Sequence, residues 1–408
     1  MPKNSTVAFS QIIADLLDDS KPFSPVHLHR FSDLNPSDLA ALKAAWQKVT
    51  TNRRVALMED LEELSEADTL VCFDDVSFMA IQDTDPRVRS TAIRLLWETN
   101  DTTFWRQLLK ILKEDPEETV RASAASGLGL FIYLGEIEEI PEDQFHLVEN
   151  TLLDIMSSDE KPLVKQKSLE GLGFSSHEKV PGLITSAFAM NDIDWKVSAL
   201  FAMGRSADNR WKDLVIRALR DPEPEIRFEA IKAAGELSLQ GARQPLMELL
   251  VNPDNRQEED IRQSIIWSLS QIGGDRVREV LNALLEQAED DEEEEFISDA
   301  IENLGLTEGM DIFGMMDIDL DEETDEDHKT GHSHHHHGNR AASEGDAHIS
   351  DEDLADLVIN NRKRGNEDDL LDLDEAGLED DSAGEDDYGD GDLYEDEYDN
   401  DEDDPEDG

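Results

Sequence analysis

A turn followed by an amphipathic helix recurs along this chain and constrains its fold more than any other feature. The clearest copy begins at Asp221 and runs to Leu237. Asp221 can cap the helix start, and prolines and acidic residues fit the first turn. The apolar residues recur at helical spacing and form one stripe: Ile226, Ala230, Ile231, Ala234 and Leu237. A helix of this kind needs neighbours to bury its stripe.

Further copies align on one basic residue near the helix start. These residues are Arg89, Arg121, Lys165, Lys196, Arg227 and Arg262, so the copies are 32, 44, 31, 31 and 35 residues apart. A last copy, in which the pattern is weaker, ends at Gly305. Another amphipathic helix precedes each copy. A period of this length predicts an all-α fold, an α-solenoid of about seven to eight helical hairpins.

Two details of the repeat carry structural expectations. An aspartate lies six residues before the basic residue in four copies: Asp83/Arg89, Asp115/Arg121, Asp159/Lys165 and Asp221/Arg227. We expect these aspartates to cap helices and to pair with basic side chains of the same or the adjacent turn. The 44-residue step predicts an insertion between the third and fourth repeats, either shaping a binding face or forming a tolerated surface loop.

The pattern resembles HEAT repeats, in the short form found in the phycobilisome-lyase-like group. The matching residues are D-x-D-P-x-V-R from Asp83 to Arg89, its twin from Asp221 to Arg227, and I-G-G-D from Ile272 to Asp275. The resemblance covers residues 36–305 and implies a HEAT-like α-solenoid. Members of the group range from bilin lyases and a di-iron hydroxylase to scaffolds, so the resemblance implies no single activity.

Composition divides the chain into an elongated body and an acidic tail. Residues 309–408 hold 39 acidic and 5 basic residues, and residues 1–308 hold 59 and 31. We expect an N-terminal leader or cap at 1–34, the solenoid at 35–308 and a disordered tail at 309–408. Because both parts are acidic, nucleic acid and anionic membranes are disfavoured as partners, and basic proteins are favoured.

Cysteine usage and hydropathy point to the cytoplasm. No apolar run approaches the length of a membrane span, and no signal-peptide pattern opens the sequence. Cys72 is the single cysteine, which excludes an internal disulfide and fits a reducing compartment. Since Leu70, Val71 and Phe73 surround it, we expect a buried structural thiol in the first helix of the second repeat.

The residues favour no catalytic centre, and we expect no cofactor. No serine or cysteine has a nearby base, and no glycine-rich phosphate loop is present. The di-iron relatives use repeated His-Glu pairs, whereas this sequence has one, His177-Glu178. The densest set of metal-ligand types is the tract at 328–337, which is either a loose zinc, nickel or copper site or a solvated tract: His332, His334, His335, His336 and His337.

Two regions are candidates for binding a protein partner. The first combines residue types that are favoured at interfaces: Trp195, Arg205, Arg210 and Trp211. Its alternative reading has the tryptophans in the core between repeats and the arginines on helix-end carbonyls. The second region, residues 349–365, has helix start and stop signals and a narrow apolar face: Leu354, Leu357 and Val358. We expect this segment to be a docking helix.

These observations favour a non-catalytic protein-interaction scaffold or adaptor that binds its partner on the solenoid surface. Two alternatives remain open at this point. One is an enzyme of the lyase or oxidoreductase members of the same repeat group. The other is an acidic chaperone for a basic protein, with the tail as a polyanionic shield.

Overall fold

The computed structural model describes residues 7–97, 99–251, 259–274, 276–288 and 290–316, with the backbone alone for 308–316. Every regular element in these ranges is helical, which confirms the predicted all-α class. Eight hairpins follow one another in the described ranges. Their first helices are α2 (Pro36–Trp46), α4 (Asp74–Ala80), α6 (Trp105–Glu114), α8 (Glu142–Ser157), α10 (Val180–Phe188), α12 (Lys212–Ala218), α14 (Arg243–Val251) and α16 (Val277–Leu285).

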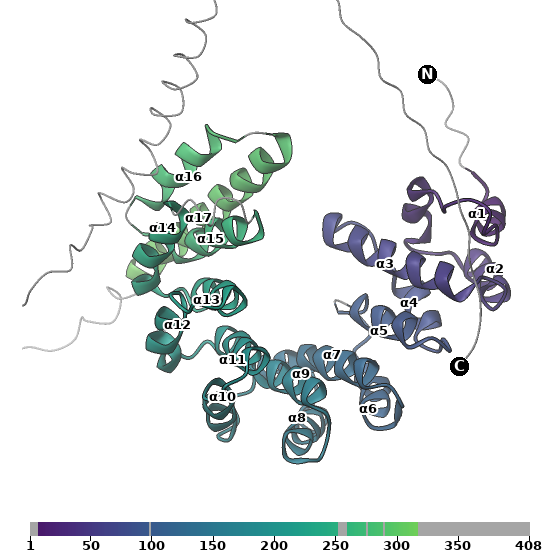
Figure 1. The fold of residues 1–408 in the computed structure, drawn as a ribbon, viewed down its shortest axis with the longest axis horizontal. Helices are drawn as coiled ribbons and strands as arrows, with labels where there is room; N and C mark the ends of the chain where they lie inside the picture. The colour runs from purple at the N-terminus through teal and green to yellow at the C-terminus, as the bar shows by residue number, and fades with distance from the viewer. Residues whose placement is uncertain (1–6, 98, 252–258, 275, 289, 317–408) are drawn as a thin grey trace, which may run out of the picture. The chain divides into compact units, whose positions relative to one another are not determined.

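The second helices form a continuous layer. They are α3 (Thr51–Ala67), α5 (Pro86–Arg94), α7 (Glu118–Glu136), α9 (Pro162–Leu172), α11 (Ile193–Arg205), α13 (Pro224–Glu236), α15 (Glu259–Ile272) and α17 (Asp291–Met316). Each contacts the next along the chain (Figure 1). The residue before the aligned basic residue is buried in five repeats: Val88, Val120, Val164, Ile226 and Ile261. The predicted α-solenoid is therefore confirmed, and the repeat register marks its core.

The N-terminal segment packs on the first hairpin. Helix α1 (Phe9–Leu16) buries Phe9, Ile12 and Leu16 and contacts α2, and the 3-10 helix η1 (Pro25–Phe31) contacts α3. The final helix, α17, continues past residue 308 to Met316. The boundaries at 34/35 and 308/309 stay predictions, and the acidic tail from residue 317 lies outside the described residues.

The long step between the third and fourth repeats is absorbed by helices. Helix α7 has 19 residues and α8 has 16, and only residues 137–141 separate them. The extra residues therefore lengthen α7 and α8, the facing helices of two successive hairpins, and the surface-loop interpretation is wrong. The physical reason is the apolar run Leu130–Leu134, which continues the helical stripe and buries Phe131 and Ile132.

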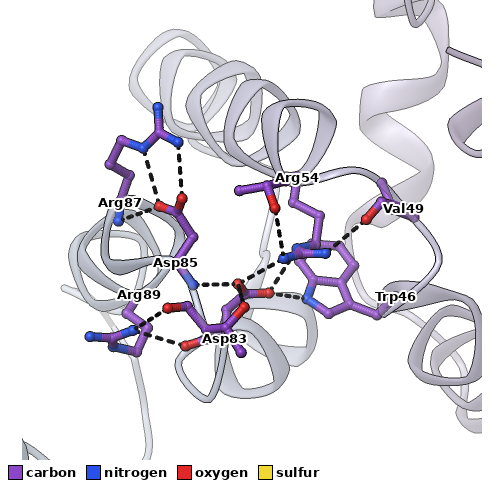
Figure 2. A network of polar contacts seen from close by, with 9 residues as sticks. Trp46, Val49, Arg54, Asp83, Asp85, Arg87 and Arg89 are labelled. Carbon is purple, nitrogen blue, oxygen red and sulfur yellow. Dashed lines mark hydrogen bonds and ion pairs between the residues drawn. The ribbon is translucent and has the colours of Figure 1, made fainter.

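A buried polar network joins the first two hairpins (Figure 2). Asp83 Oδ2 accepts a hydrogen bond from Trp46 Nε1 at 2.6 Å, and Asp83 Oδ1 accepts one from Arg54 Nη2 at 3.2 Å. Arg54 Nε also lies 2.9 Å from Asp83 Oδ2. Arg54 also donates to the Val49 carbonyl at 2.7 Å. Both charged side chains are almost fully buried. Asp83 thus links two hairpins and does not cap a helix; Asp85 caps α5.

Arginines bridge successive turns in the same manner further along. Arg89 Nη1 donates to the Asp83 and Thr84 carbonyls, and its Nε and Nη2 donate to the Asp115 carboxylate of the next repeat at 2.9 and 2.8 Å. Arg121 binds the Asp115 carbonyl and the Glu160 carboxylate. We call the set an arginine ladder: Arg54, Arg89, Arg121 and Arg262, the last paired with Glu293.

The ladder refines the predicted aspartate–arginine pairs. Within one repeat the arginine binds the aspartate's main-chain carbonyl, and the carboxylate pairs with the arginine of the preceding repeat. At the fourth repeat Glu160, and not Asp159, accepts from Arg121. Asp221 accepts from the Glu223 amide in the turn before α13, so it does not cap that helix.

Glycines allow the second helices to approach closely in the middle of the solenoid. A Cβ at Gly173 would lie 2.8 Å from Ala202 Cα, and one at Gly235 would lie 2.9 Å from Ser268 Cα. These distances are below ordinary contact, so a larger residue would force the helices apart. We call these positions the glycine contacts: Gly129 against Gly171, Gly173 against Ala202, Gly204 against Ala233 and Gly235 against Ser268.

Candidate protein-interaction surface

The repeat register places chemically distinctive side chains on one face of the second helices. Positions five and nine residues after the aligned basic residue lie one helical turn apart and share a face. The first position holds Phe201, Lys232 and Trp267 in α11, α13 and α15. The second holds Phe174, Arg205 and Glu236, none of them fully buried. Except for Arg205, these residues were not singled out from the sequence, although the register itself was the signal that marks them.

Aromatic rings and cations alternate across three of these helices. The Arg205 guanidinium lies 4.7 Å from the Phe174 ring centroid and 4.1 Å from that of Phe201. Lys232 Nζ lies 5.6 Å from the Phe201 and the Phe228 centroids. We call this set the aromatic–cation row: Phe174, Arg205, Phe201, Lys232 and Phe228. Rings of this kind attract cations electrostatically and hold them in place.

Arg205 has unused hydrogen-bonding capacity. Among the described residues, no acceptor takes a hydrogen bond from the Arg205 side chain, and no carboxylate lies within 4.0 Å of its guanidinium. Partial burial lowers the pKa of Arg205, while the more distant carboxylates of Glu236, Glu170 and Glu229 oppose that shift. A guanidinium carries five donors in a planar fork that matches carboxylates and carbonyls. The Arg205 guanidinium therefore keeps donors that no acceptor among the described residues takes up.

Carboxylates lie behind the row and are mostly engaged. Glu170 accepts from Ser198 Oγ at 2.7 Å and from Lys167 Nζ at 2.8 Å. Glu229 is buried beside Lys232 Nζ at 3.4 Å. Burial raises the pKa of Glu229, and the charges of Glu236 and Glu170 add to this effect. The pKa of Glu236 is also raised by partial burial, although its side chain keeps contact with solvent.

Three cavities open on the same layer of helices. One of about 390 Å³ extends from α3 to α11 and is lined by Leu130, Tyr133, Phe174 and Arg205 among others. A neighbouring cavity of about 470 Å³ is more polar and includes Arg87, Arg94 and Lys167. The third, about 440 Å³, lies between α13, α15 and α17: Phe228, Lys232, Trp267 and Phe296 line it. Aromatic residues with a few polar groups are typical of surfaces that bind peptides and small ligands.

Comparison with known proteins gives the family. The model of HEAT repeats matches residues 76–173 and 180–259, which hold α5, α7, α9, α11 and α13 of the second-helix layer. The chain is a HEAT-repeat protein. The match does not single out the phycobilisome-lyase-like group, which remains a resemblance. A search of curated proteins found no match.

Two solved structures match this chain with low sequence identity. An X-ray structure of YibA from Escherichia coli is 17% identical, with a TM-score of 0.35, and the match covers 71% of this chain and 99% of that one. A structure of human deoxyhypusine hydroxylase in complex with glycerol is 16% identical, with a TM-score of 0.30, and the match covers 65% of this chain and 95% of that one.

The HEAT solenoid separates the four predicted interface residues. Arg205 lines the surface cavity between α3 and α11, as described. Trp211 is buried in the core, where the alternative reading put it, and Arg210 lies over its ring and pairs with Asp208 at 2.5 Å. Trp195 is half-buried at the start of α11 and packs against the core. The tail candidates lie outside the described residues: His332, His334, His335, His336, His337, Leu354, Leu357 and Val358.

Cys72 differs from its prediction. It is exposed in the turn before α4, and it is not a buried residue of that helix. Its main chain is bound to the N-terminal segment: the amide donates to Ser32 Oγ and the carbonyl accepts from the Asp33 amide. The neighbouring Leu70 is 89% exposed, so the apolar run around Cys72 is a surface turn and not a helical stripe.

Among the described residues, no cluster of three or more His, Cys, Asp or Glu side chains has an arrangement suited to a metal ion. In the same residues no helix combines the length and apolarity needed to cross a membrane.

Proposed function

We propose that this HEAT-repeat protein is a non-catalytic scaffold that binds a protein partner on the layer of second helices. The aromatic–cation row carries the proposal, because it presents half-buried rings and an arginine with unused donors on a rigid helical support. Aromatic residues and arginine are the side chains that contribute most at protein interfaces. Helical positioning keeps their entropy cost of binding low.

Charge indicates the class of partner. Residues 1–308 hold 59 acidic and 31 basic residues, so the net charge of the body favours the approach of free basic macromolecules at long range. We propose a basic protein whose apolar side chains contact the rings of the row and whose carbonyl or carboxylate oxygens accept from Arg205. A cytoplasmic location belongs to the same proposal.

Capture of partners from native lysate tests this function. The full-length chain is compared with Phe201→Ala and Arg205→Ala, and Arg210→Ala is the matched control, since Arg210 is exposed and outside the row. We expect the row variants to lose the same partner with a roughly thirtyfold drop in affinity, about 2 kcal/mol, and the control to retain it. Equal capture by all variants, with release by moderate salt, contradicts the proposal and favours the acidic chaperone.

A further inference from the structure

We propose that residues 350–358 of this chain bind to its own aromatic–cation row and compete there with the protein partner. The inference rests on the proposed function, because it assigns a regulator to the same surface. Within the row, Arg205 keeps hydrogen-bond donors that a carboxylate of the segment can use.

The chemistry of the segment complements the row. Residues 350–358 read Ser-Asp-Glu-Asp-Leu-Ala-Asp-Leu-Val, and its helix signals predict an amphipathic turn. On such a helix Leu354, Leu357 and Val358 share one face, and the carboxylates of Asp351 and Asp353 flank it. The row offers the counterpart, with three rings for the apolar face and two cations for the carboxylates. A carboxylate is the acceptor that a guanidinium binds most strongly.

The length of intervening chain suits this pairing. The described body ends at Met316, and 33 residues separate it from Ser350. An unstructured chain of that length has a mean end-to-end distance of about 30 Å. Helix α11 is the third second-helix back from α17, through α15 and α13. Packed helices lie 8–10 Å apart, so the row is on the order of 30 Å from the start of the linker.

Matched length makes even weak docking significant. A linker whose mean reach equals the distance to be spanned gives an effective concentration of about 1 mM. A segment that binds with an intrinsic dissociation constant of about 0.1 mM then occupies the row roughly ten-elevenths of the time. The same occupancy weakens the apparent affinity of an outside partner about tenfold. A partner must therefore bind the row tightly enough to displace the segment.

Amide hydrogen exchange of the full-length chain, read by mass spectrometry, tests the inference without knowledge of the partner. We expect exchange within residues 350–358 to be slowed about tenfold. Arg205→Gln with Lys232→Gln on the row, and Leu354→Ser with Leu357→Ser on the segment, should each remove this protection. Arg210→Gln with Arg217→Gln, a pair of exposed arginines outside the row, is the control that should retain it.

Each result is decisive. Free exchange in the unmodified chain overturns the proposal, and so does protection that persists in the row variant, since another surface then holds the segment. Protection that falls on dilution indicates docking to a second copy and also overturns it. If Arg205→Gln lowers the unfolding midpoint, Lys232→Gln alone provides the row variant.

The outcome is separable from that of the proposed function. Partner capture that depends on the row, together with free exchange of 350–358, leaves the scaffold and removes the regulator. Protection of the segment without any captured partner supports docking and removes the scaffold. When both hold, Leu354→Ser with Leu357→Ser should increase partner affinity about tenfold.

Discussion

Arg54 and Asp83 form a buried ion pair that joins the first hairpin to the second. The closest contact joins Arg54 Nε and Asp83 Oδ2 at 2.9 Å, and Trp46 donates to the same carboxylate oxygen at 2.6 Å. The surrounding side chains exclude water, so each charge depends on the other for its compensation. The pair fixes how two neighbouring turns meet.

Removal of one partner from this pair should be strongly destabilising. We expect Asp83→Asn to lower the free energy of unfolding by about 3–5 kcal/mol, because it leaves the Arg54 guanidinium buried without a counter-charge. Urea unfolding with amide exchange of α3 and α5 measures the effect. Arg87→Ala is the control in the same turn: it breaks the exposed Arg87–Asp85 pair and should change stability little. Equal effects of the two variants would contradict the assigned burial.

Two glycine substitutions should act in opposite directions. Gly173→Ala places a methyl group 2.8 Å from Ala202 Cα and should destabilise the protein by about 1–3 kcal/mol. Gly182→Ala in α10 meets no atom within 4 Å and should stabilise it by roughly 0.5–1 kcal/mol through higher helix propensity. Thermal unfolding of both variants tests the close approach of α9 and α11. A neutral Gly173→Ala would show that these helices separate easily.

Glu229 should make stability depend on pH. Its pKa is raised in the folded state by burial, so the stabilising contribution is complete below the unfolded pKa. That contribution is lost as pH rises through the folded pKa. We therefore expect Glu229→Gln to raise the unfolding midpoint relative to the unmodified chain near pH 8, with a smaller difference near pH 4. A difference that does not vary with pH would contradict a titrating carboxyl at this position.

Cys72 should react completely but slowly with a maleimide in the native protein. The thiol is exposed, so folding does not block it. Partial burial raises the pKa of Cys72, helped by the nearby Asp74 and Asp33 charges, and a smaller thiolate fraction lowers the rate at neutral pH. The measured rate should rise with pH and reach its midpoint above that of a free cysteine. If the maleimide labelled Cys72 only after unfolding, the thiol would be buried, as the sequence predicted.

The periodic part of the fold was predictable from sequence because one physical rule repeats. Apolar residues at helical spacing must be buried, and Val88, Val120 and Val164 are buried at equivalent positions. Cys72 lay outside any periodic stripe, so its apolar neighbours gave a misleading impression of burial. Local composition predicts burial only where a period accompanies it.

The interaction surface was only partly predictable, since it depends on contacts between repeats. Arg205 stood out by residue type, but its two ring partners come from different hairpins, Phe174 after α9 and Phe201 in α11. Trp211 stood out for the same reason and is instead buried. Residue type alone does not distinguish a core tryptophan from an interface tryptophan; the position within the repeat does.

The arginine ladder and the glycine contacts join different pairs of second helices, except at α7 and α9, which have both. Arginines bridge α3 to α5, α5 to α7, α7 to α9 and α15 to α17, and the glycine contacts join each pair of second helices from α7 to α15. Every junction in the described layer therefore has at least one of two kinds of contact, a polar one at the turns or a tight one along the helix axes. Repeats from the two halves are not interchangeable parts. A chimaera that moves the hairpin α4–α5 between α10–α11 and α12–α13 would keep the HEAT pattern and still lack a matching surface on both sides.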